Sequence, residues 1–424
     1  MHRIVAMIFA GGRVPELGVL TERRAKAAVV FGGAYRTIDF ALTNLADAGI
    51  GQVGILAQYR PSSLMDHVGS GMAWDLVGTD RTVRFLPPYL GPGAGEWYRG
   101  PADALYQNID FIQRHAPEHV LVVSGDHVSK MDYRPLLDFH RERDADLTMA
   151  FKPMEEDPSR YGIGEINAVG QIMNFVEKPE YPRTNLASIG VYLFKRQVLL
   201  DELSTAVAGR EGATFEIHEI LHRMIPRRRA YGYVFHGEWH YTRTLDEYVA
   251  FHHKLLGPDP AVDLNLWDVR SNVMARRSHP APPARVLPGG VVENSLVCPG
   301  CVIEGTVRNS VLSRGVHVQK DAVVDDCVLW EDVVVETAAQ LSGVVSDKRV
   351  HFGPGCQVGR GESIPSTEMR GSLTCGASVF GMDVRVPAGA RIGRNCVVHA
   401  DARGEDFAGE VASGSSVKRT EVTR

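Results

Sequence analysis

The apolar positions of the first 250 residues alternate between short runs and longer amphipathic segments. The runs 4–9, 53–57 and 120–124 have the length of buried strands, and the segments 38–48 and 102–113 have the length and spacing of helices. This alternation predicts βαβ units and a mostly parallel sheet. Glycines follow the first and the last of these strands, at the carboxyl ends where open parallel sheets bind ligands.

The pattern changes after residue 255. A stretch rich in proline and arginine follows, which predicts a linker over 256–286. Beyond it, apolar residues recur every five or six positions, and Gly, Asp and Asn fill many gaps. This step differs from the helical period of 3.6 and the strand period of 2, and it is typical of β-helix coils. A β-sandwich is the alternative that the persistence of the step disfavours. The repeating positions include Val302, Val307, Leu312, Val318, Val324, Leu329, Val335 and Leu341.

Length and charge narrow the possible classes. At roughly 150 residues per domain, 424 residues predict two or three domains, here 1–255, the linker 256–286 and an assembly or regulatory domain over 287–424. The net charge of −5 argues against nucleic-acid binding. No apolar run approaches the ~20 residues of a membrane span, so we expect a cytoplasmic protein without a membrane partner.

All six cysteines lie late in the chain. Cys298 and Cys301 have zinc-ligand spacing, but a four-cysteine site needs a second close pair, which the sequence lacks. Small buried cysteines on a strand scaffold are the favoured interpretation.

The candidate chemistry begins directly after the first strand, at residues 10–13. Glycines there would let backbone N–H groups approach a polyphosphate. Several further motifs follow in a fixed order: Arg23-Arg24-Ala25-Lys26, Gly125-Asp126-His127, Phe175-Val176-Glu177-Lys178-Pro179 and Ser188-Ile189-Gly190-Val191-Tyr192. This constellation resembles the ADP-glucose pyrophosphorylase (glucose-1-phosphate adenylyltransferase) family, and the resemblance spans the first ~250 residues and the β-helical tail.

The resemblance implies a Rossmann-like α/β nucleotidyltransferase domain followed by a left-handed parallel β-helix. It further implies a homo-oligomer, either a dimer or a tetramer. The implied reaction joins a sugar 1-phosphate to an NTP with Mg²⁺ as cofactor and releases pyrophosphate, as in glycogen biosynthesis.

The resemblance also carries site residues over to this chain. The catalytic set would be Arg13, Lys26, Asp126 and Lys178, and Asp126 would bind the metal. Nucleotide binding would fall to Ala10, Gly11, Gly12, Gln58 and Gly100, and sugar-phosphate binding to Tyr98, Gly162, Glu177, Lys178 and Ser188.

Three departures from the family pattern affect this chemistry. Glu16 replaces an arginine that faces the triphosphate, Tyr241 replaces a second metal-binding carboxylate, and Ala34 replaces a lysine associated with activators. Three functions therefore stay open: adenylylation of glucose 1-phosphate, activation of a cyclitol 1-phosphate such as valienol 1-phosphate with ATP or GTP in secondary metabolism, and a non-catalytic regulatory subunit. Retention of the Asp126 and Glu177-Lys178 motifs favours an enzyme.

Overall fold

The computed structural model describes residues 4–89, 97–207, 214–275, 281–407 and 409–420. Its contacts divide the chain into two compact units. The first unit comprises Met1–Gly12 and Thr37–Tyr241, and the second comprises Arg13–Arg36 and Thr242–Arg424. The early segment Arg13–Arg36 thus groups with the C-terminal half of the chain, which the predicted boundary at residue 255 does not anticipate.

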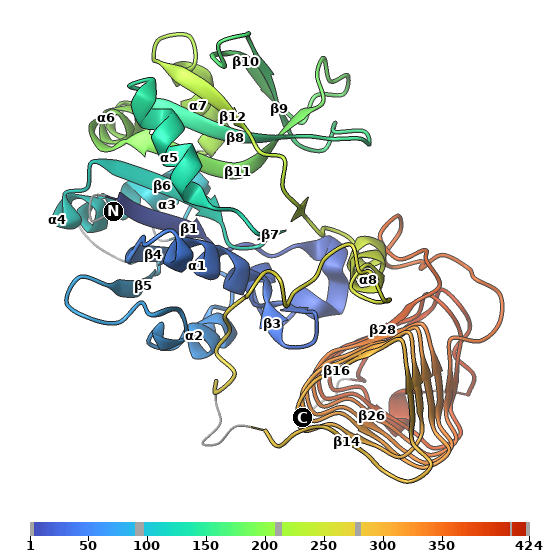
Figure 1. Cartoon of the computed structure of the whole chain (residues 1–424). Helices are drawn as coiled ribbons and strands as arrows, with labels where there is room; N and C mark the ends of the chain where they lie inside the picture. Colours follow the sequence, from blue (N-terminus) through green and yellow to red (C-terminus); the bar gives the residue numbers. More distant parts are fainter. Residues whose placement is uncertain (1–3, 90–96, 208–213, 276–280, 408, 421–424) are drawn as a thin grey trace. The chain divides into compact units, whose positions relative to one another are not determined.

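A nine-stranded sheet forms the centre of the first unit, with the order β10-β9-β11-β6-β1-β4-β5 and with β8 pairing to β11 and β12 (Figure 1). β6, β1, β4 and β5 are mutually parallel, as the alternating pattern predicts. β11 runs antiparallel to β6, so the sheet as a whole is mixed. The strands are β1 (Ile4–Phe9), β4 (Gln52–Leu56), β5 (Thr82–Leu86), β6 (His119–Ser124), β8 (Leu147–Pro153), β9 (Gly162–Ile166), β10 (Ile172–Glu177), β11 (Leu186–Lys195) and β12 (Ala230–Val234).

Helices flank this sheet because its central strands are apolar on both faces. Every residue of β1 and β6 except the last is buried, which is the pattern of a covered parallel sheet. The helices are α1 (Thr37–Asp47), α2 (Ser62–Val68), α3 (Pro101–Gln107), α4 (Ile109–His115), α5 (Tyr133–Glu142), α6 (Arg196–Val207) and α7 (Ile217–Met224). A two-stranded ladder of β7 (Val128–Ser129) and β13 (Trp239–His240) completes the unit.

Three parallel sheets form a β-helix in the second unit, seen as stacked coils in Figure 1. The ladder pairs Val307 with Val324, Val324 with Leu341 and Leu341 with Val358, so residues of the predicted repeat stack directly inside the core. The prediction of a β-helix is confirmed, and the β-sandwich is excluded.

Successive coils contribute short strands to the three sheets in turn, and the last strand, β32 (Ser416–Val417), extends the third sheet alone. The first sheet contains β14 (Arg285–Val286), β17 (Val302–Ile303), β20 (His317–Val318), β23 (Val334–Val335), β26 (His351–Phe352) and β29 (Arg385–Val386). The second contains β15 (Val291–Glu293), β18 (Thr306–Arg308), β21 (Val323–Asp325), β24 (Gln340–Ser342), β27 (Gln357–Val358) and β30 (Arg391–Ile392). The third contains β16 (Leu296–Val297), β19 (Val311–Leu312), β22 (Val328–Leu329), β25 (Val344–Ser346), β28 (Ser378–Phe380), β31 (Val397–Val398) and β32 (Ser416–Val417).

The outer face of the third sheet is also buried, because residues 13–36 and one helix pack on it. Residues such as Leu20, Val30 and Leu245 share a hydrophobic cluster with Val328 and Trp330 of the coils. The covering elements are the 3₁₀ turns η1 (Pro15–Thr21) and η2 (Lys26–Ala28), the strands β2 (Val30–Phe31) and β3 (Tyr35–Arg36), and helix α8 (Leu245–His253). This cluster explains why the early segment belongs to the second unit.

A fully buried ion pair also joins residues 13–36 to the coils. Arg24 donates to both carboxylate oxygens of Asp347 at 2.7 and 3.0 Å, and each side chain is 1% exposed. The guanidinium lies 5.0 Å from the ring centroid of Trp330. The Trp330 indole N–H donates to the Tyr248 hydroxyl, which donates to the Val30 carbonyl. Polar and apolar contacts therefore fix the early segment to the coils together.

Within the described ranges, no helix has the length and apolarity to cross a membrane. All six cysteines are free thiols, and Cys301, Cys327, Cys356 and Cys396 are buried, as expected for small core residues of a strand scaffold. Cys298 is half-buried, and the expectation of burial is wrong for Cys375, which is exposed.

Arg24→Met should destabilise the second unit by about 3–5 kcal/mol, because it leaves the Asp347 carboxylate buried without its cation. Denaturant unfolding followed by tryptophan fluorescence measures this loss. The control is Glu293→Gln, which breaks the half-exposed pair with Arg308 and should change stability by less than about 1 kcal/mol. Equal effects of both substitutions would contradict the role given to the buried pair.

The stability of the second unit should also fall as the pH rises, through His399. Its ring bonds Glu22 at 2.7 Å and Glu368 at 2.9 Å, and the hydrogen bond to Glu22 and both carboxylate charges raise its pKa above 6.5 against the effect of burial. The stabilisation is complete below the unfolded-state pKa and is lost as the pH passes the folded-state pKa. Thermal unfolding between pH 5.5 and 8.5 should show this slope, and His399→Gln should flatten it. An unchanged slope in that variant would refute the assignment.

Candidate functional site

The carboxyl ends of β6, β1 and β4 meet at the predicted phosphate loop. Gly125 N–H donates to the Phe9 carbonyl at 2.9 Å, and Ala10 N–H donates to the Leu56 carbonyl at 3.0 Å. A Cβ on Gly11 would lie 3.1 Å from the Gln58 amide nitrogen, whereas a Cβ on Gly12 would meet no atom within 4 Å. Gly11 therefore permits close packing of the loop against β4, and Gly12 leaves open space on its surface.

Asp126 follows β6 at this same edge of the sheet. Its Oδ1 accepts a hydrogen bond from the Ser124 hydroxyl at 2.5 Å, and its side chain is 19% exposed. His127 Nε2 lies 3.7 Å from the same oxygen, too far for a hydrogen bond. The carboxylate is thus oriented by its own strand end and remains accessible to a ligand.

The His127 ring has two possible partners at Nδ1. Trp239 Nε1–H donates to it at 3.2 Å, and it also lies 3.1 Å from the Ile189 carbonyl. Accepting from Trp239 requires an unprotonated Nδ1, so the neutral ring then carries its proton on Nε2, toward Asp126.

Tyr241 belongs to a cluster of four rings rather than to a group of carboxylates. Its centroid lies 4.7 Å from that of His127 in an edge-to-face arrangement, and it stacks on Trp239 at 6.4 Å. Tyr161 completes the cluster at 5.4 Å from Trp239. Where the resemblance implies a second acidic ligand, this chain has aromatic packing that orients His127.

The Glu177-Lys178 motif lies at the end of β10, beside β9. Glu177 pairs with Gly162 across the two strands, and a Cβ at Gly162 would lie 2.8 Å from Glu177 Oε2 and 2.4 Å from the Phe175 ring. Lys178 N–H donates to the Tyr161 carbonyl at 3.0 Å, and its backbone is left-handed with φ of 47°. This turn leaves the Lys178 ammonium half exposed, 3.5 Å from Glu177 Oε1.

Two further side chains border this motif. Ser188 and Tyr192 share a hydrogen bond at 3.3 Å on β11, and burial raises the pKa of Tyr192 to about 12, so its hydroxyl stays protonated. Glu216 interacts electrostatically with both Lys178 and Glu177, and burial raises its pKa. Glu216 is absent from the predicted site residues, and none of the motifs that carry the family resemblance above contains it.

Hydrogen bonds join Gln58 to the loop that contains Tyr98 and Gly100. Tyr98 N–H donates to Gln58 Oε1 at 2.5 Å, and Gln58 Nε2–H donates back to the Tyr98 carbonyl at 3.4 Å. The Tyr98 hydroxyl donates to the Leu86 carbonyl and accepts from Asn108, so it is engaged within the fold. Gly100 has φ of 130°, and a Cβ there would lie 2.4 Å from the Phe215 carbonyl oxygen.

Arg13, Lys26 and Glu16 belong to the second unit. Arg13 is exposed, whereas Lys26 is 1% exposed at the start of η2. Glu16 is ion-paired with Arg243, whose Nη2 lies 2.9 Å from Glu16 Oε1. Where the resemblance implies an arginine, this chain therefore has a carboxylate accompanied by the opposite charge of Arg243.

The donor set around Asp126 fits Mg²⁺ bound through one carboxylate. No group of three or more acidic, histidine or cysteine side chains with metal-binding geometry occurs in the described residues. Magnesium commonly takes one or two carboxylates and completes its shell with water and substrate phosphates. Acidic residues close to Tyr241 in the sequence have other partners. Glu238 pairs with His240 at 3.0 Å, and Asp246 accepts hydrogen bonds from Thr374 and Cys375.

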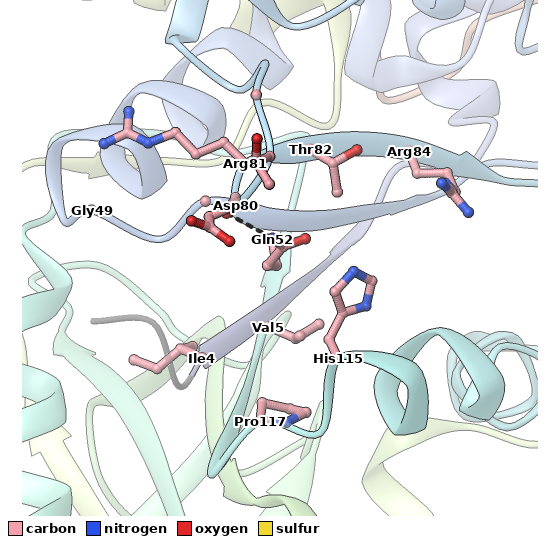
Figure 2. Close-up of a pocket in the computed structure, with 13 residues that line it drawn as sticks. Ile4, Val5, Gly49, Gln52, Asp80, Arg81, Thr82, Arg84, His115 and Pro117 are labelled. Atoms are coloured by element: carbon pink, nitrogen blue, oxygen red, sulfur yellow. Dashed lines mark hydrogen bonds between the residues drawn. The ribbon is translucent and has the colours of Figure 1, made fainter.

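A separate cavity of about 540 Å³ opens at the opposite edge of the sheet (Figure 2). It is lined by Ile4, Gln52 and Thr82, which begin β1, β4 and β5, and by Arg84 and His115. None of the predicted site residues lines it. The predicted site and this cavity are therefore distinct.

Two family models match the chain. Residues 5–257 match the nucleotidyl transferase family, and residues 282–372 match the GlmU-like C-terminal hexapeptide. Relatives match almost throughout: the glucose-1-phosphate adenylyltransferase of Thermomicrobium roseum is 40% identical over 98% of both chains, and that of Acetivibrio thermocellus is 38% identical over 96% of both. The enzyme of the same name from Thermotoga maritima is 38% identical over 96% of both chains.

The chain belongs to the glucose-1-phosphate adenylyltransferase family. Membership identifies the first unit's sheet as a nucleotidyltransferase sheet and the coils as a hexapeptide-type left-handed β-helix. In this family member, most predicted residues of the first unit lie at strand ends and in loops, Ser188 lies within β11, and Arg13 and Lys26 lie in the other unit.

On the sugar-phosphate role that the resemblance implies for Glu177, Gly162→Ala should displace this carboxylate and raise KM for the sugar phosphate roughly tenfold, while KM for the NTP changes little. Steady-state kinetics with each substrate varied in turn would measure this. The matched control is Gly164→Ala on the same strand, where a Cβ would meet the Phe151 ring at 2.4 Å and would not meet Glu177. If both variants raise the same KM equally, general distortion of β9 explains the result and the role of Gly162 is refuted.

Proposed function

We propose that this protein transfers an adenylyl group from ATP to glucose 1-phosphate. A phosphate oxygen of the sugar phosphate attacks the α-phosphorus of ATP, the bond from that phosphorus to the bridging oxygen breaks, and the electron pair leaves with pyrophosphate. The products are ADP-glucose and pyrophosphate. Names and near-complete coverage of the relatives support this choice of substrates.

One observation supports the proposal most directly: Asp126 and the Gly11-Gly12 loop follow adjacent parallel strands. β1 and β6 pair in register from Ile4 with His119 to Phe9 with Ser124, so a carboxylate and a glycine loop emerge side by side. A glycine loop suits a polyphosphate because no side chain blocks the approach to its backbone, and a neighbouring carboxylate suits the counter-cation.

The proposed role of each residue follows from its charge or from its polar groups. Asp126 would hold Mg²⁺, which supplies charge neutralisation on the phosphates when bound. Lys26 and Arg13 would bind the NTP phosphates, and Lys178 would bind the phosphate of the sugar. Glu177 and Ser188 would accept or donate hydrogen bonds to sugar hydroxyls, with Gly162 and Tyr98 shaping that side, while Ala10, Gly11, Gly12, Gln58 and Gly100 would surround the nucleotide.

We assign substrate binding to residues 1–255 and self-assembly to the β-helix of 287–424, joined by the linker 256–286. The stacked coils present parallel edge strands and a rigid surface, which suit contact with a second copy of the chain. The expected assembly is a homo-oligomer.

The deciding experiment measures pyrophosphate release with Mg²⁺ across ATP, GTP, UTP, CTP and dTTP, each with glucose 1-phosphate and with cyclitol 1-phosphates. Release with ATP and glucose 1-phosphate alone supports the proposal. Release only with a cyclitol phosphate would replace it with the specialised-metabolism function. Absence of release from folded protein that binds nucleotide would indicate a regulatory subunit.

Asp126→Asn should lower Mg²⁺-dependent turnover by about 10²-fold or more without lowering the melting temperature, because it removes the charge that holds the cation. Direct Mn²⁺ binding, measured by electron paramagnetic resonance in the presence of ATP, should weaken in parallel. The control Asp132→Asn changes the N-cap residue of α5, whose carboxylate accepts hydrogen bonds from Arg134, and it should retain turnover. Full activity in the Asp126 variant would show that the metal site lies elsewhere.

A further inference from the structure

The cavity at the amino ends of β1, β4 and β5 is built entirely from the first unit. Its wall is formed by the starts of these strands and by the connections from α1 to β4, from η3 (Met72–Trp74) to β5 and from α4 to β6. Its volume of about 540 Å³ lies within the range of small-molecule sites, about 300–1,000 Å³. β1 runs about 17 Å from Ile4 at this cavity to Phe9 before the glycine loop, so a small molecule held here stays clear of Asp126.

Strand register places polar side chains on one face of the sheet at this cavity. Gln52 pairs with Thr82 across β4 and β5, and Arg84 lies two residues beyond Thr82, on the same face. α4 covers this face, because Gly54 pairs with Arg84 and a Cβ on Gly54 would lie 3.1 Å from the Phe111 ring. The cavity therefore lies between the polar starts of β4 and β5 and the last turn of α4 (Figure 2).

Arg84 and His115 supply the groups that can bind an anion. Arg84 is exposed, and no residue in the described part of the chain forms a hydrogen bond or ion pair with its guanidinium. His115 Nδ1 lies 2.8 Å from the Phe111 carbonyl oxygen, which only accepts, so Nδ1 carries a proton and Nε2 remains for a ligand.

The two states of this His115 nitrogen favour a phosphate. Nε2 accepts from a P–OH group when the ring is neutral, and it donates to a phosphate oxygen when the ring is protonated. A phosphate monoester offers both forms near neutral pH because its second pKa is about 6. A carboxylate or a sulfate has no such proton to give.

The opposite end of the cavity supplies hydrogen-bond acceptors. Gln52 Nε2 donates to the Asp80 carbonyl at 2.7 Å, and the buried Oε1 of the same amide accepts no hydrogen bond within the described ranges. The Asp80 carboxylate is exposed on the same wall, and Arg81 is engaged by Asp75. Figure 2 shows Gln52 between Asp80 and Arg84. These acceptors suit the hydroxyl groups of a ligand and disfavour a second anionic group at that end.

We infer that the cavity is a second ligand site, which binds a phosphate monoester that carries hydroxyl groups. The phosphate lies at Arg84 and His115, and the hydroxyls donate to Asp80 and to the Gln52 amide. The inference goes beyond the proposed function and does not depend on it, because no residue assigned to catalysis or to substrate binding lines the cavity.

Hydrogen–deuterium exchange of the full chain with glycerol 3-phosphate, a small probe with both groups, tests the inference. The ester should protect the segments 78–84 and 113–117, and the concentration dependence of this protection gives the Kd at the cavity. Arg84→Gln should raise that Kd about tenfold or more, because it removes a charge-assisted hydrogen bond. Thr82→Tyr should abolish the protection, because the ring fills the cavity without changing its charge. Circular dichroism checks that each variant is folded.

Controls isolate the parts of the site. Arg134→Gln removes an exposed arginine paired with Asp132 at the start of α5, and it should leave the Kd unchanged. Glycerol, which lacks the phosphate, should give no protection. Inorganic sulfate should bind more weakly than inorganic phosphate, because it has no proton to donate to His115.

Four results would overturn the inference. They are the absence of protection at 78–84 and 113–117, equal protection in Arg84→Gln, equal protection by glycerol, and sulfate binding as tight as that of phosphate. Protection confined to the segments 10–13 and 124–127 counts as the first of these, because it would assign phosphate binding to the glycine loop alone. Turnover is not measured, so the outcome is independent of the proposed reaction.

Discussion

The buried pair of Arg24 and Asp347 determines which part of the molecule carries the predicted phosphate-binding cations. A charged pair at 1% exposure needs a fixed geometry, and here Arg24 also donates to the Leu20 carbonyl and lies over the Trp330 ring, although its Nε has no hydrogen-bond partner among the described residues. The pair fixes residues 13–36 to the coils. Lys26, two positions beyond Arg24, is consequently held by the β-helix unit rather than by the strands that carry Asp126.

Within the first unit, the chemistry follows from strand direction. Parallel β6, β1 and β4 end at one edge, so short segments after each strand bring a carboxylate, a glycine loop and Gln58 to a common region. The antiparallel β9 and β10 contribute Glu177 and Lys178 at a turn. The rings of Trp239 and Tyr241 pack against His127, the neighbour of Asp126. Aromatic packing therefore stands where the resemblance implies a second carboxylate.

Much of this architecture was predictable from local patterns. The five-to-six-residue step predicted the β-helix because Val307, Val324, Leu341 and Val358 stack on successive coils. Asp126 could be placed at a strand end because the apolar run before it has the length of a strand. Glu16 could not be judged by local pattern, since its partner Arg243 lies 227 residues away and only tertiary structure brings the two together.

The grouping of residues 13–36 with the coils was equally inaccessible, because it depends on the outer face of a sheet formed by residues 296–417. Periodicity reports which residues face a core, but it does not report which distant segment covers the other face. The electrostatic interaction of Glu216 with Glu177 and Lys178 escaped prediction for a similar reason, since it depends on how α7 and β10 are placed together.

The division of the chain has a consequence for how such proteins diversify. The two matched family models cover residues 5–257 and 282–372, so a single recombination junction between them would exchange one matched half between relatives. A chimera joined there would combine Arg24 and the apolar residues of 13–36 from one parent with Asp347 and Trp330 from another. In such a chimera, residues 13–36 and the coil residues that they contact come from different parents and do not match. The early segment and the coils are therefore expected to evolve together.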